Sequence, residues 1–188
     1  MEVIATDLPE VKIIVPKRVG DSRGFFSETY RRDALSNAGI DCDFLQDNHS
    51  LSEKKGTLRG LHFQTPPHSQ AKLVRVVRGA VFDAVVDIRH GSPNFGKSIA
   101  AVLSAENGRQ MFVPAGFAHA FLTLEPATEV IYKVDDYYAP DCEGGIIWND
   151  PQIGIEWPIE QPILSAKDAQ LGRLAELSVV FAYDDSGR

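Results

Sequence analysis

Short apolar runs, separated by turns that contain glycine or proline, dominate this sequence and limit what it can fold into. The runs are rich in β-branched and aromatic side chains, and they occupy residues 11–15, 72–78, 80–88, 99–103, 110–113, 118–124 and 128–134. Residues 80–88 alternate between two faces. One face carries Phe82, Ala84, Val86 and Ile88, and the other carries Val81, Asp83, Val85 and Asp87. Many short strands with few helices predict an all-β fold, an antiparallel sandwich or barrel.

Two short helices are expected beside these strands. One covers roughly residues 31–38 and ends at Gly39, a residue suited to the left-handed conformation after a helix. The other begins near Ser165, whose hydroxyl would cap it, with Asp168 in the place where a capping box usually has Glu. The polar residues 183–188 are expected to fray.

Length and charge exclude several classes of protein. The 188 residues, 44% of them hydrophobic, suit a single soluble domain over residues 1–188, with its core at about 10–170. A net charge of −7 argues against binding nucleic acid or anionic membrane through bulk charge. No apolar run reaches the roughly 18 residues that span a bilayer, and the N-terminus does not resemble a signal peptide. Cys42 and Cys142 are therefore expected to be free thiols in a cytoplasmic protein.

Histidine is scarce, and two of the five histidines lie among apolar strand residues. These are His62, between Leu61 and Phe63, and His119, within the run from Phe117 to Phe121. Most histidines in such a context are packing residues with one satisfied hydrogen bond, but both could serve as acid–base groups. A zinc or iron site would favour a closely spaced histidine pair, which is absent here, so no metal is expected.

Three basic residues also lie outside charge runs: Arg23, Arg59 and Lys72. Each could extend to the surface or pair with an acid, and the three could equally converge on an anion such as a phosphate. Tyr132 fits core packing, and the capping role alone would account for Asp168. Spacing in the sequence does not choose between these interpretations.

Taken together, these segments resemble the dTDP-4-dehydrorhamnose 3,5-epimerase family. The matching stretches follow one another from about residue 10 to 170, and they include DSRGFFSE (21–28), QDNHS (46–50), LRGLHFQ (58–64), KLVR (72–75), FDAVVDIR (82–89), FVPAGFAHAF (112–121), YK (132–133), YY (137–138), WNDP (148–151), IGIEWP (153–158) and LSAKD (164–168). The resemblance implies a cupin-type β jelly roll, a homodimer, and no metal or organic cofactor. It also implies a substrate that joins dTDP to a 4-keto-6-deoxy sugar, in dTDP-rhamnose biosynthesis.

The resemblance assigns roles residue by residue. His62 matches the general base, Tyr132 the acid, Asp168 the carboxylate that orients the histidine, and Lys72 the cation near the keto oxygen. Other positions match residues that bind the nucleotide or the sugar: Arg23, Glu28, Gln46, Asn48, Arg59, His119, Glu143 and Lys167.

The chemistry of such a substrate requires groups of these kinds. The C4 ketone acidifies the protons on C3 and C5, so a base of near-neutral pKa such as His62 can remove them. Negative charge then develops on the ketone oxygen, where the Lys72 cation would stabilise it. Inversion needs a proton from the opposite face, which Tyr132 would supply.

The nucleotide needs different groups. Arg59 and Arg23 would hold the diphosphate, because guanidinium groups suit phosphate. Thymine would stack on an aromatic ring, either Phe26 or Tyr138.

Some local questions stay open at the level of sequence. Strict alternation from Leu58 places Arg59 and His62 on opposite faces, so either Gly60 forms a bulge or Arg59 reaches around the rim or into a neighbouring subunit. Asp168 would cap a helix, orient His62, or do both with different oxygens. Ala120, where the family usually has glycine, is expected to crowd the pocket slightly.

Three alternative functions also remain. A mono-epimerase would invert only C3 or C5 of a related sugar nucleotide. A metal-dependent cupin oxygenase or isomerase would bind a metal at His62 and His119. A non-catalytic sugar-nucleotide binding module is disfavoured, because His62, Tyr132, Lys72 and Asp168 are all present.

Overall fold

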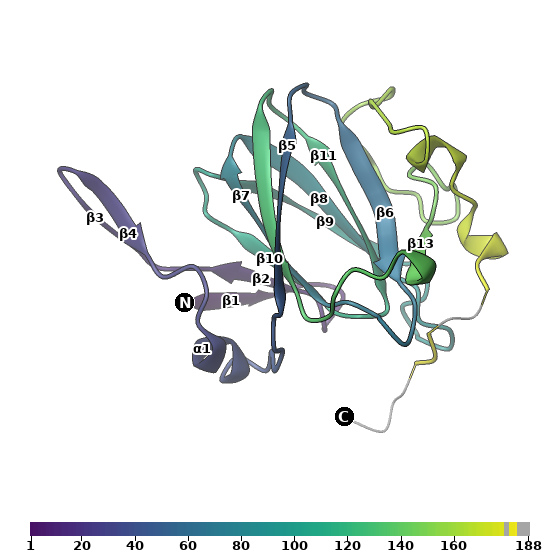
Figure 1. Cartoon of the computed structure of the whole chain (residues 1–188), viewed down its shortest axis with the longest axis horizontal. Helices are drawn as coiled ribbons and strands as arrows, with labels where there is room; N and C mark the ends of the chain where they lie inside the picture. The colour runs from purple at the N-terminus through teal and green to yellow at the C-terminus, as the bar shows by residue number, and fades with distance from the viewer. Residues whose placement is uncertain (179–180, 184–188) are drawn as a thin grey trace.

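The computed structural model describes residues 1–178 and 181–183, and two antiparallel sheets face each other in it as a jelly roll (Figure 1). The six-stranded sheet has the order β1 (Glu2–Ala5), β2 (Lys12–Val15), β10 (Gln110–Val113), β7 (Lys72–Arg78), β12 (Thr128–Val134) and β5 (Gln46–Ser52). The five-stranded sheet has the order β13 (Glu143–Gly145), β6 (Leu58–Gln64), β11 (Phe117–Thr123), β8 (Ala80–Asp87) and β9 (Ser98–Ser104). A separate hairpin of β3 (Arg18–Asp21) and β4 (Gly24–Ser27) extends from one end. The predicted cupin-type jelly roll is therefore confirmed.

The apolar runs predicted the central strands well and the polar strands poorly. Residues 72–78, 110–113 and 128–134 form β7, β10 and β12 with the predicted bounds, and the other predicted strands differ by a residue at their ends. The sequence QDNHSLS of β5 has no apolar run, yet every one of its residues pairs with β12. Strand β5 forms because its neighbour supplies the backbone partners, which propensity alone cannot reveal.

Two apolar clusters explain how the sheets are layered. The central cluster lies between the sheets and includes Val74 of β7, Val85 of β8 and Phe121 of β11. A second cluster, on the outer face of the five-stranded sheet, joins Val86 of β8 to Phe63 of β6. Strand β8 is therefore covered on both faces, and its predicted alternation places Asp83 and Asp87 on the inner face with Val85.

The first predicted helix is present but short, and the second prediction is wrong. Helix α1 (Arg32–Ser36) ends where Gly39 adopts a φ of +80° and the Ile40 N–H donates to the Leu35 carbonyl at 2.9 Å. The other short elements are 3-10 turns: η1 (Pro140–Cys142), η2 (Asp168–Gln170) and η3 (Leu174–Glu176). In the described part of the chain no α-helix follows Ser165, because the backbone becomes extended again at Leu171. No helix within 1–178 and 181–183 is long and apolar enough to cross a membrane.

The C-terminal segment packs against the outside of the five-stranded sheet. Ile146, Ile153 and Leu174 join the second cluster there, and the Trp157 ring meets the edge of Phe82 on β8. Residues 184–188, where fraying was predicted, lie outside the described residues. Tyr183 itself is bound, because its N–H donates to the His90 carbonyl at 2.9 Å. Cys42 and Cys142 are free thiols, as predicted.

Candidate active site

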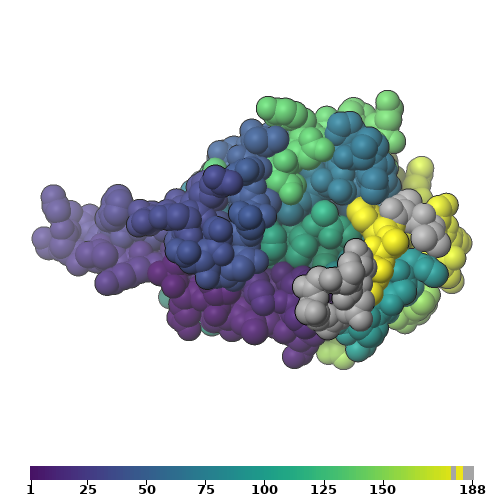
Figure 2. Space-filling model, turned by 90° about the horizontal axis from the view of Figure 1, so that it is seen from below, coloured from purple at the N-terminus to yellow at the C-terminus, as the bar shows by residue number. Residues whose placement is uncertain are grey.

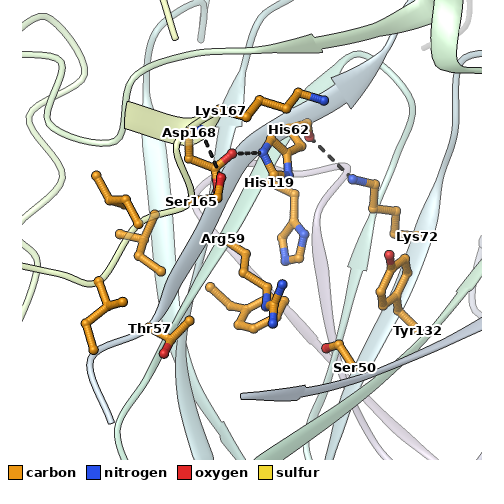
Figure 3. A pocket seen from close by; sticks show the side chains of 14 residues that line it. Ser50, Thr57, Arg59, His62, Lys72, His119, Tyr132, Ser165, Lys167 and Asp168 are labelled. Carbon is orange, nitrogen blue, oxygen red and sulfur yellow. Dashed lines mark hydrogen bonds and ion pairs between the residues drawn. The ribbon is translucent and has the colours of Figure 1, made fainter. Parts of the chain in front are cut away.

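A cavity of about 470 Å³ opens between the two sheets and is lined by all of the predicted catalytic residues (Figure 3). Fourteen residues line it: Ser50, Thr57, Leu58, Arg59, His62, Lys72, His119, Phe121, Tyr132, Ile163, Leu164, Ser165, Lys167 and Asp168. Strands β6 and β11 of one sheet supply His62 and His119, and strands β7 and β12 of the other supply Lys72 and Tyr132. Asp168 reaches the same space from the C-terminal segment, so all four residues predicted to act in catalysis meet there beside the predicted binding residue His119.

His62 is fixed by a buried carboxylate from a segment distant in sequence. Its Nε2 lies 2.6 Å from Oδ1 of Asp168, whose side chain is only 5% exposed. Because a carboxylate accepts the proton of Nε2, the tautomer that this contact favours leaves Nδ1 free as a base. Burial lowers the pKa of His62 below 6.5, with the Lys72 charge acting in the same direction and Asp168 opposing both. The imidazole is therefore neutral, and able to accept a proton, at neutral pH.

Of the roles considered for Asp168, the structure shows the one at His62 and not the one as a cap. Its N–H donates to the Ser165 Oγ at 3.0 Å, so Ser165 caps the turn as predicted. Its carboxylate does not return the capping bond but binds His62. The first turn of the segment thus aims the carboxylate into the cavity.

Gly60 resolves the conflict between Arg59 and His62. The pairing of β6 with β11 shifts by one residue between His119 and Phe121, which is a bulge centred on Gly60 and Leu61. Gly60 has a φ of +120°, and a Cβ there would lie 2.5 Å from the His119 carbonyl oxygen, so only glycine fits. The predicted bulge is confirmed, and both side chains line the cavity.

Ala120, by contrast, was wrongly expected to crowd the cavity. Its methyl group belongs to the second cluster, on the outer face of β11, where it lies against Gly60. Alternation along β11 points His119 inward and Ala120 outward. The departure from the family pattern at Ala120 therefore adds outer packing and leaves the cavity unchanged.

Lys72 and Tyr132 approach the cavity from the six-stranded sheet, on the other side from Asp168 (Figure 3). Lys72 Nζ donates to the His62 carbonyl at 3.3 Å. Burial lowers the pKa of Lys72 to about 8, and the charges of Asp83 and Glu143 oppose that shift. Burial also raises the pKa of Tyr132 above 10, with Arg59 opposing. At neutral pH both groups consequently carry their protons.

A second histidine–carboxylate pair lies on the floor of the cavity. The Nε2 of His119 is 3.0 Å from both carboxylate oxygens of Asp83, which is fully buried on β8. His119 was predicted to bind substrate, and it lines the cavity as that role requires. Asp83 was given no role from sequence, although an acid inside an apolar strand was a usable signal of a buried polar site.

Five further predicted binding residues form a hydrogen-bonded chain that reaches the cavity at Lys167, and we call it the mouth cluster; Asn48, at its other end, also lines a second groove. Gln46 donates from Nε2 to Asn48 Oδ1 at 2.9 Å and accepts the Tyr138 N–H at 3.3 Å. The Tyr138 hydroxyl donates to Glu143 Oε2 at 3.1 Å, and Glu143 pairs with Lys167, which lines the cavity. Burial opposes ionisation of Glu143, but the bonds from Lys167 and Tyr138 hold its pKa below 4.5. The cluster thus presents polar groups and one aromatic ring beside the cavity.

The structure does not bring the other three predicted residues to this cavity. Arg23 and Phe26 lie on the protruding β3–β4 hairpin, seen at the left of Figure 2, where their exposures are 87% for the Arg23 side chain and 73% for Phe26. Arg23 binds Asp21, the acid two residues before it, at 2.5 Å. Glu28 lies at the base of the hairpin and lines a separate groove on the outer face of the six-stranded sheet. Within one chain these residues are therefore remote from His62.

The carboxylate contacts also bear on the metal-binding alternative. Within the described part of the chain, no group of three or more His, Cys, Asp or Glu side chains is arranged to hold a metal ion. His62 and His119 each direct Nε2 to a carboxylate of their own, Asp168 or Asp83.

Known proteins share both the sequence and the fold. Residues 5–176 match a family model described as dTDP-4-dehydrorhamnose 3,5-epimerase. A protein of that name from Salmonella typhimurium is 54% identical over 171 residues, which cover 90% of this chain and 93% of the relative.

Two solved structures extend the comparison. The Legionella pneumophila dTDP-6-deoxy-D-glucose-3,5-epimerase, in complex with dTDP-4-keto-L-rhamnose, is 45% identical with a TM-score of 0.93, covering 97% of this chain and 98% of that one. A 3'-monoepimerase from Streptomyces bikiniensis, in complex with dTDP-quinovose, is 33% identical with a TM-score of 0.88, covering 95% and 92%. With a family model that spans nearly the whole chain and relatives at about half identity, this protein belongs to the dTDP-4-dehydrorhamnose 3,5-epimerase family.

Proposed function

We propose that this protein epimerises C3 and C5 of dTDP-4-dehydro-6-deoxy-D-glucose and yields dTDP-4-dehydro-L-rhamnose, as a step of dTDP-rhamnose biosynthesis. One observation carries the proposal. An imidazole prepared as a base and a phenol that retains its proton approach one cavity from two facing sheets, with a lysine ammonium in the same space. A hexose ring between them would be deprotonated on one face and reprotonated on the other.

The first half of each epimerisation is proton removal. His62 Nδ1 takes the proton from the carbon beside the C4 ketone, and the electron pair of that C–H bond moves onto the ketone oxygen as an enolate. The Asp168 carboxylate stabilises the imidazolium that results, as its 2.6 Å contact with Nε2 supports. The Lys72 ammonium stabilises the enolate oxygen, and an enclosed site strengthens that charge interaction.

The second half is proton return from the opposite face. The Tyr132 hydroxyl donates its proton to the enolate carbon, the ketone re-forms, and the carbon is inverted. The positive charge of Arg59, which lowers the pKa that burial raises, supports the phenolate left behind. Repetition at the second carbon requires the phenol and the imidazole to exchange their protons with solvent, and the open mouth of the cavity permits this.

The remaining predicted residues would bind the dTDP part of the substrate. Arg59 and His119 lie beside the sugar position, so they suit the phosphate nearest to it. The mouth cluster lies further out, and its Tyr138 ring is 56% exposed, as a stacking platform for thymine requires.

The β3–β4 hairpin supports a homodimer in which each chain completes the other's site. The hairpin exposes three large apolar side chains, Val19, Phe25 and Phe26, at 58%, 61% and 73%, and grouped exposed apolar side chains are typical of a surface that binds another chain. A second copy would cover these side chains and would receive Arg23 and Phe26 beside its own mouth cluster. Sedimentation of the purified protein, and loss of dTDP affinity in the Arg23→Ala variant, test this arrangement.

Proton NMR in heavy water tests the reaction itself. With the dTDP-4-keto-6-deoxyglucose substrate, we expect deuterium to enter at both C3 and C5 and the L-rhamno product to appear. Exchange at neither carbon would overturn the proposal.

Inversion at one carbon alone would identify a mono-epimerase. That alternative needs a direct test, because a 3'-monoepimerase shares this fold with a TM-score of 0.88.

A further inference from the structure

Asp83 is a buried charged residue that the proposed mechanism does not use. It lies on the inner face of β8, is fully buried, and meets His119 Nε2 with both oxygens at 3.0 Å. Burying a carboxylate is costly unless cationic or hydrogen-bonding partners compensate. The burial of this carboxylate beside the catalytic cavity therefore indicates that its negative charge has a role there.

Among the residues that the structure describes, the lysine of the cavity has no carboxylate within ion-pair distance. In the described structure Lys72 Nζ donates to the His62 carbonyl at 3.3 Å and forms no ion pair with a carboxylate. Burial alone drives a lysine toward its neutral form, which could not stabilise an enolate. Negative charge at longer range is then what favours the ammonium, and Asp83 is the largest such contribution, ahead of Glu143.

We propose that Asp83 is a positioning residue for the epimerisation, which fixes the His119 ring through Nε2 and maintains the positive charge of Lys72 across the cavity. The inference rests on the proposed function for its catalytic consequence. Asp83 and Lys72 come from facing sheets, β8 and β7, so one carboxylate would link the two walls electrostatically. His119, held by Nε2, would keep Nδ1 directed at the substrate.

Other groups also act on Lys72 and must be kept constant in any test. The charged and titratable side chains around the same cavity are Arg59 and His62 from β6, His119 from β11, Tyr132 from β12, Glu143 from β13, and Lys167 and Asp168 from the C-terminal segment. Of these, Glu143 already pairs with Lys167, and Asp168 already pairs with His62. Asp83 is paired with His119, and its charge ranks first among those that favour the ammonium form of Lys72.

The Asp83→Asn variant separates the charge from the shape. Asparagine keeps an oxygen that can accept the His119 N–H but removes the negative charge. In the free enzyme, NMR of the lysine side chains, assigned with a Lys72→Met variant, should show the Lys72 titration midpoint falling from about 8 by about one pH unit. The alkaline limb of kcat/KM should move to lower pH by the same amount.

Strand β8 offers a matched control in Asp87. It lies on the same face, is equally buried, and binds Arg89 and Ser92 outside the cavity. Asp87→Asn should lower stability but leave the Lys72 midpoint and the alkaline limb in place. An unchanged midpoint in Asp83→Asn, or an equal shift in Asp87→Asn, would overturn the proposal.

The role at His119 needs a second comparison. Asp83→Ala removes both the charge and the acceptor, so its KM should rise about 10-fold above that of Asp83→Asn, in which the ring stays anchored. Equal KM values in the two variants would refute the anchoring of His119. The NMR titration requires no substrate, so it decides the role of Asp83 even if deuterium exchange shows that the proposed reaction is wrong.

Discussion

The two sheets that enclose the cavity hold their titratable groups in different ways. On the five-stranded sheet, His62 and His119 each direct Nε2 to a buried carboxylate, at 2.6 Å and 3.0 Å. On the six-stranded sheet, Lys72 meets only a carbonyl oxygen at 3.3 Å among the described residues, and burial shifts the pKa values of both Lys72 and Tyr132. Burial shifts pKa values on both walls, but a carboxylate partner opposes the shift of His62 at hydrogen-bond distance, whereas Lys72 has no carboxylate that close among the described residues.

This difference matches the proposed roles of the two sheets. The five-stranded sheet carries the base that removes a proton, and the six-stranded sheet carries the acid that returns one. A carboxylate on one imidazole nitrogen makes the other nitrogen a better base and stabilises the cation that forms. A buried phenol without such a partner keeps its proton until negative charge develops beside it. The comparison predicts that substitutions at the site residues of the five-stranded sheet affect proton removal. Substitutions at those of the six-stranded sheet should affect enolate stabilisation and proton return.

The largest effect is expected for His62→Ala. Without the imidazole, solvent deuterium exchange at both C3 and C5 should fall about 10⁴-fold, while dTDP binding stays nearly intact. His68, which pairs with Asp136 outside the cavity at 3.0 Å, supplies the control variant His68→Ala. Wild-type exchange in His62→Ala, measured by NMR, would show that another group is the base.

The next largest effect is expected for Asp168→Asn. The amide can donate to Nε2, which would move the imidazole proton onto Nδ1 and block the base, so kcat should fall about 10³-fold with little change in KM. Asp136→Asn, the corresponding change at the partner of His68, should leave kcat unchanged. A large rise in KM with normal kcat would instead give Asp168 a role in binding.

A smaller and qualitatively different effect is expected for Tyr132→Phe. Inversion should slow about 10²-fold, but deuterium should still enter with retained configuration, because His62 can return the proton to the face it came from. Tyr30→Phe, where the ring lies against Phe44 on the outer side, is the control. If the rates of deuterium exchange and of inversion fell by the same factor in Tyr132→Phe, the assignment of proton removal to one sheet and proton return to the other would be wrong.

The mildest perturbation is pH. The base is active above the His62 pKa, which burial places below 6.5, and the cation is active below the Lys72 pKa of about 8. The profile of kcat/KM should therefore be bell-shaped, falling on the acid side as His62 gains a proton and on the alkaline side as Lys72 loses one. In a Lys72→Met variant only the acid limb should remain.

Sequence alone predicts the scaffold better than the site. Regular alternation in strands such as 128–134 identifies the core because burial imposes a period of two on the residues. It misses β5, whose polar residues depend on β12 for their pairing, and the hairpin at Arg18–Ser27. Alternation of apolar and polar side chains is visible within one short stretch of sequence. The pairing of β5 is not, because it depends on β12, which is distant in the sequence.

The site is assembled from contacts that no local pattern contains. His62 and Asp168 are 106 residues apart in the chain, and only the family resemblance grouped them in advance. The Gly60 bulge could be foreseen, because alternation alone would have separated Arg59 from His62. Asp83 was visible as a polar residue in an apolar strand, but its partner His119 was not.

The position of Asp168 also has a consequence for how activity is acquired. Every strand of both sheets precedes residue 146, so a ribosome would complete the barrel before it releases the carboxylate that orients the base. A chain cut by a protease near residue 160 would therefore lose Asp168 and, with Leu174, part of the apolar cover of the five-stranded sheet.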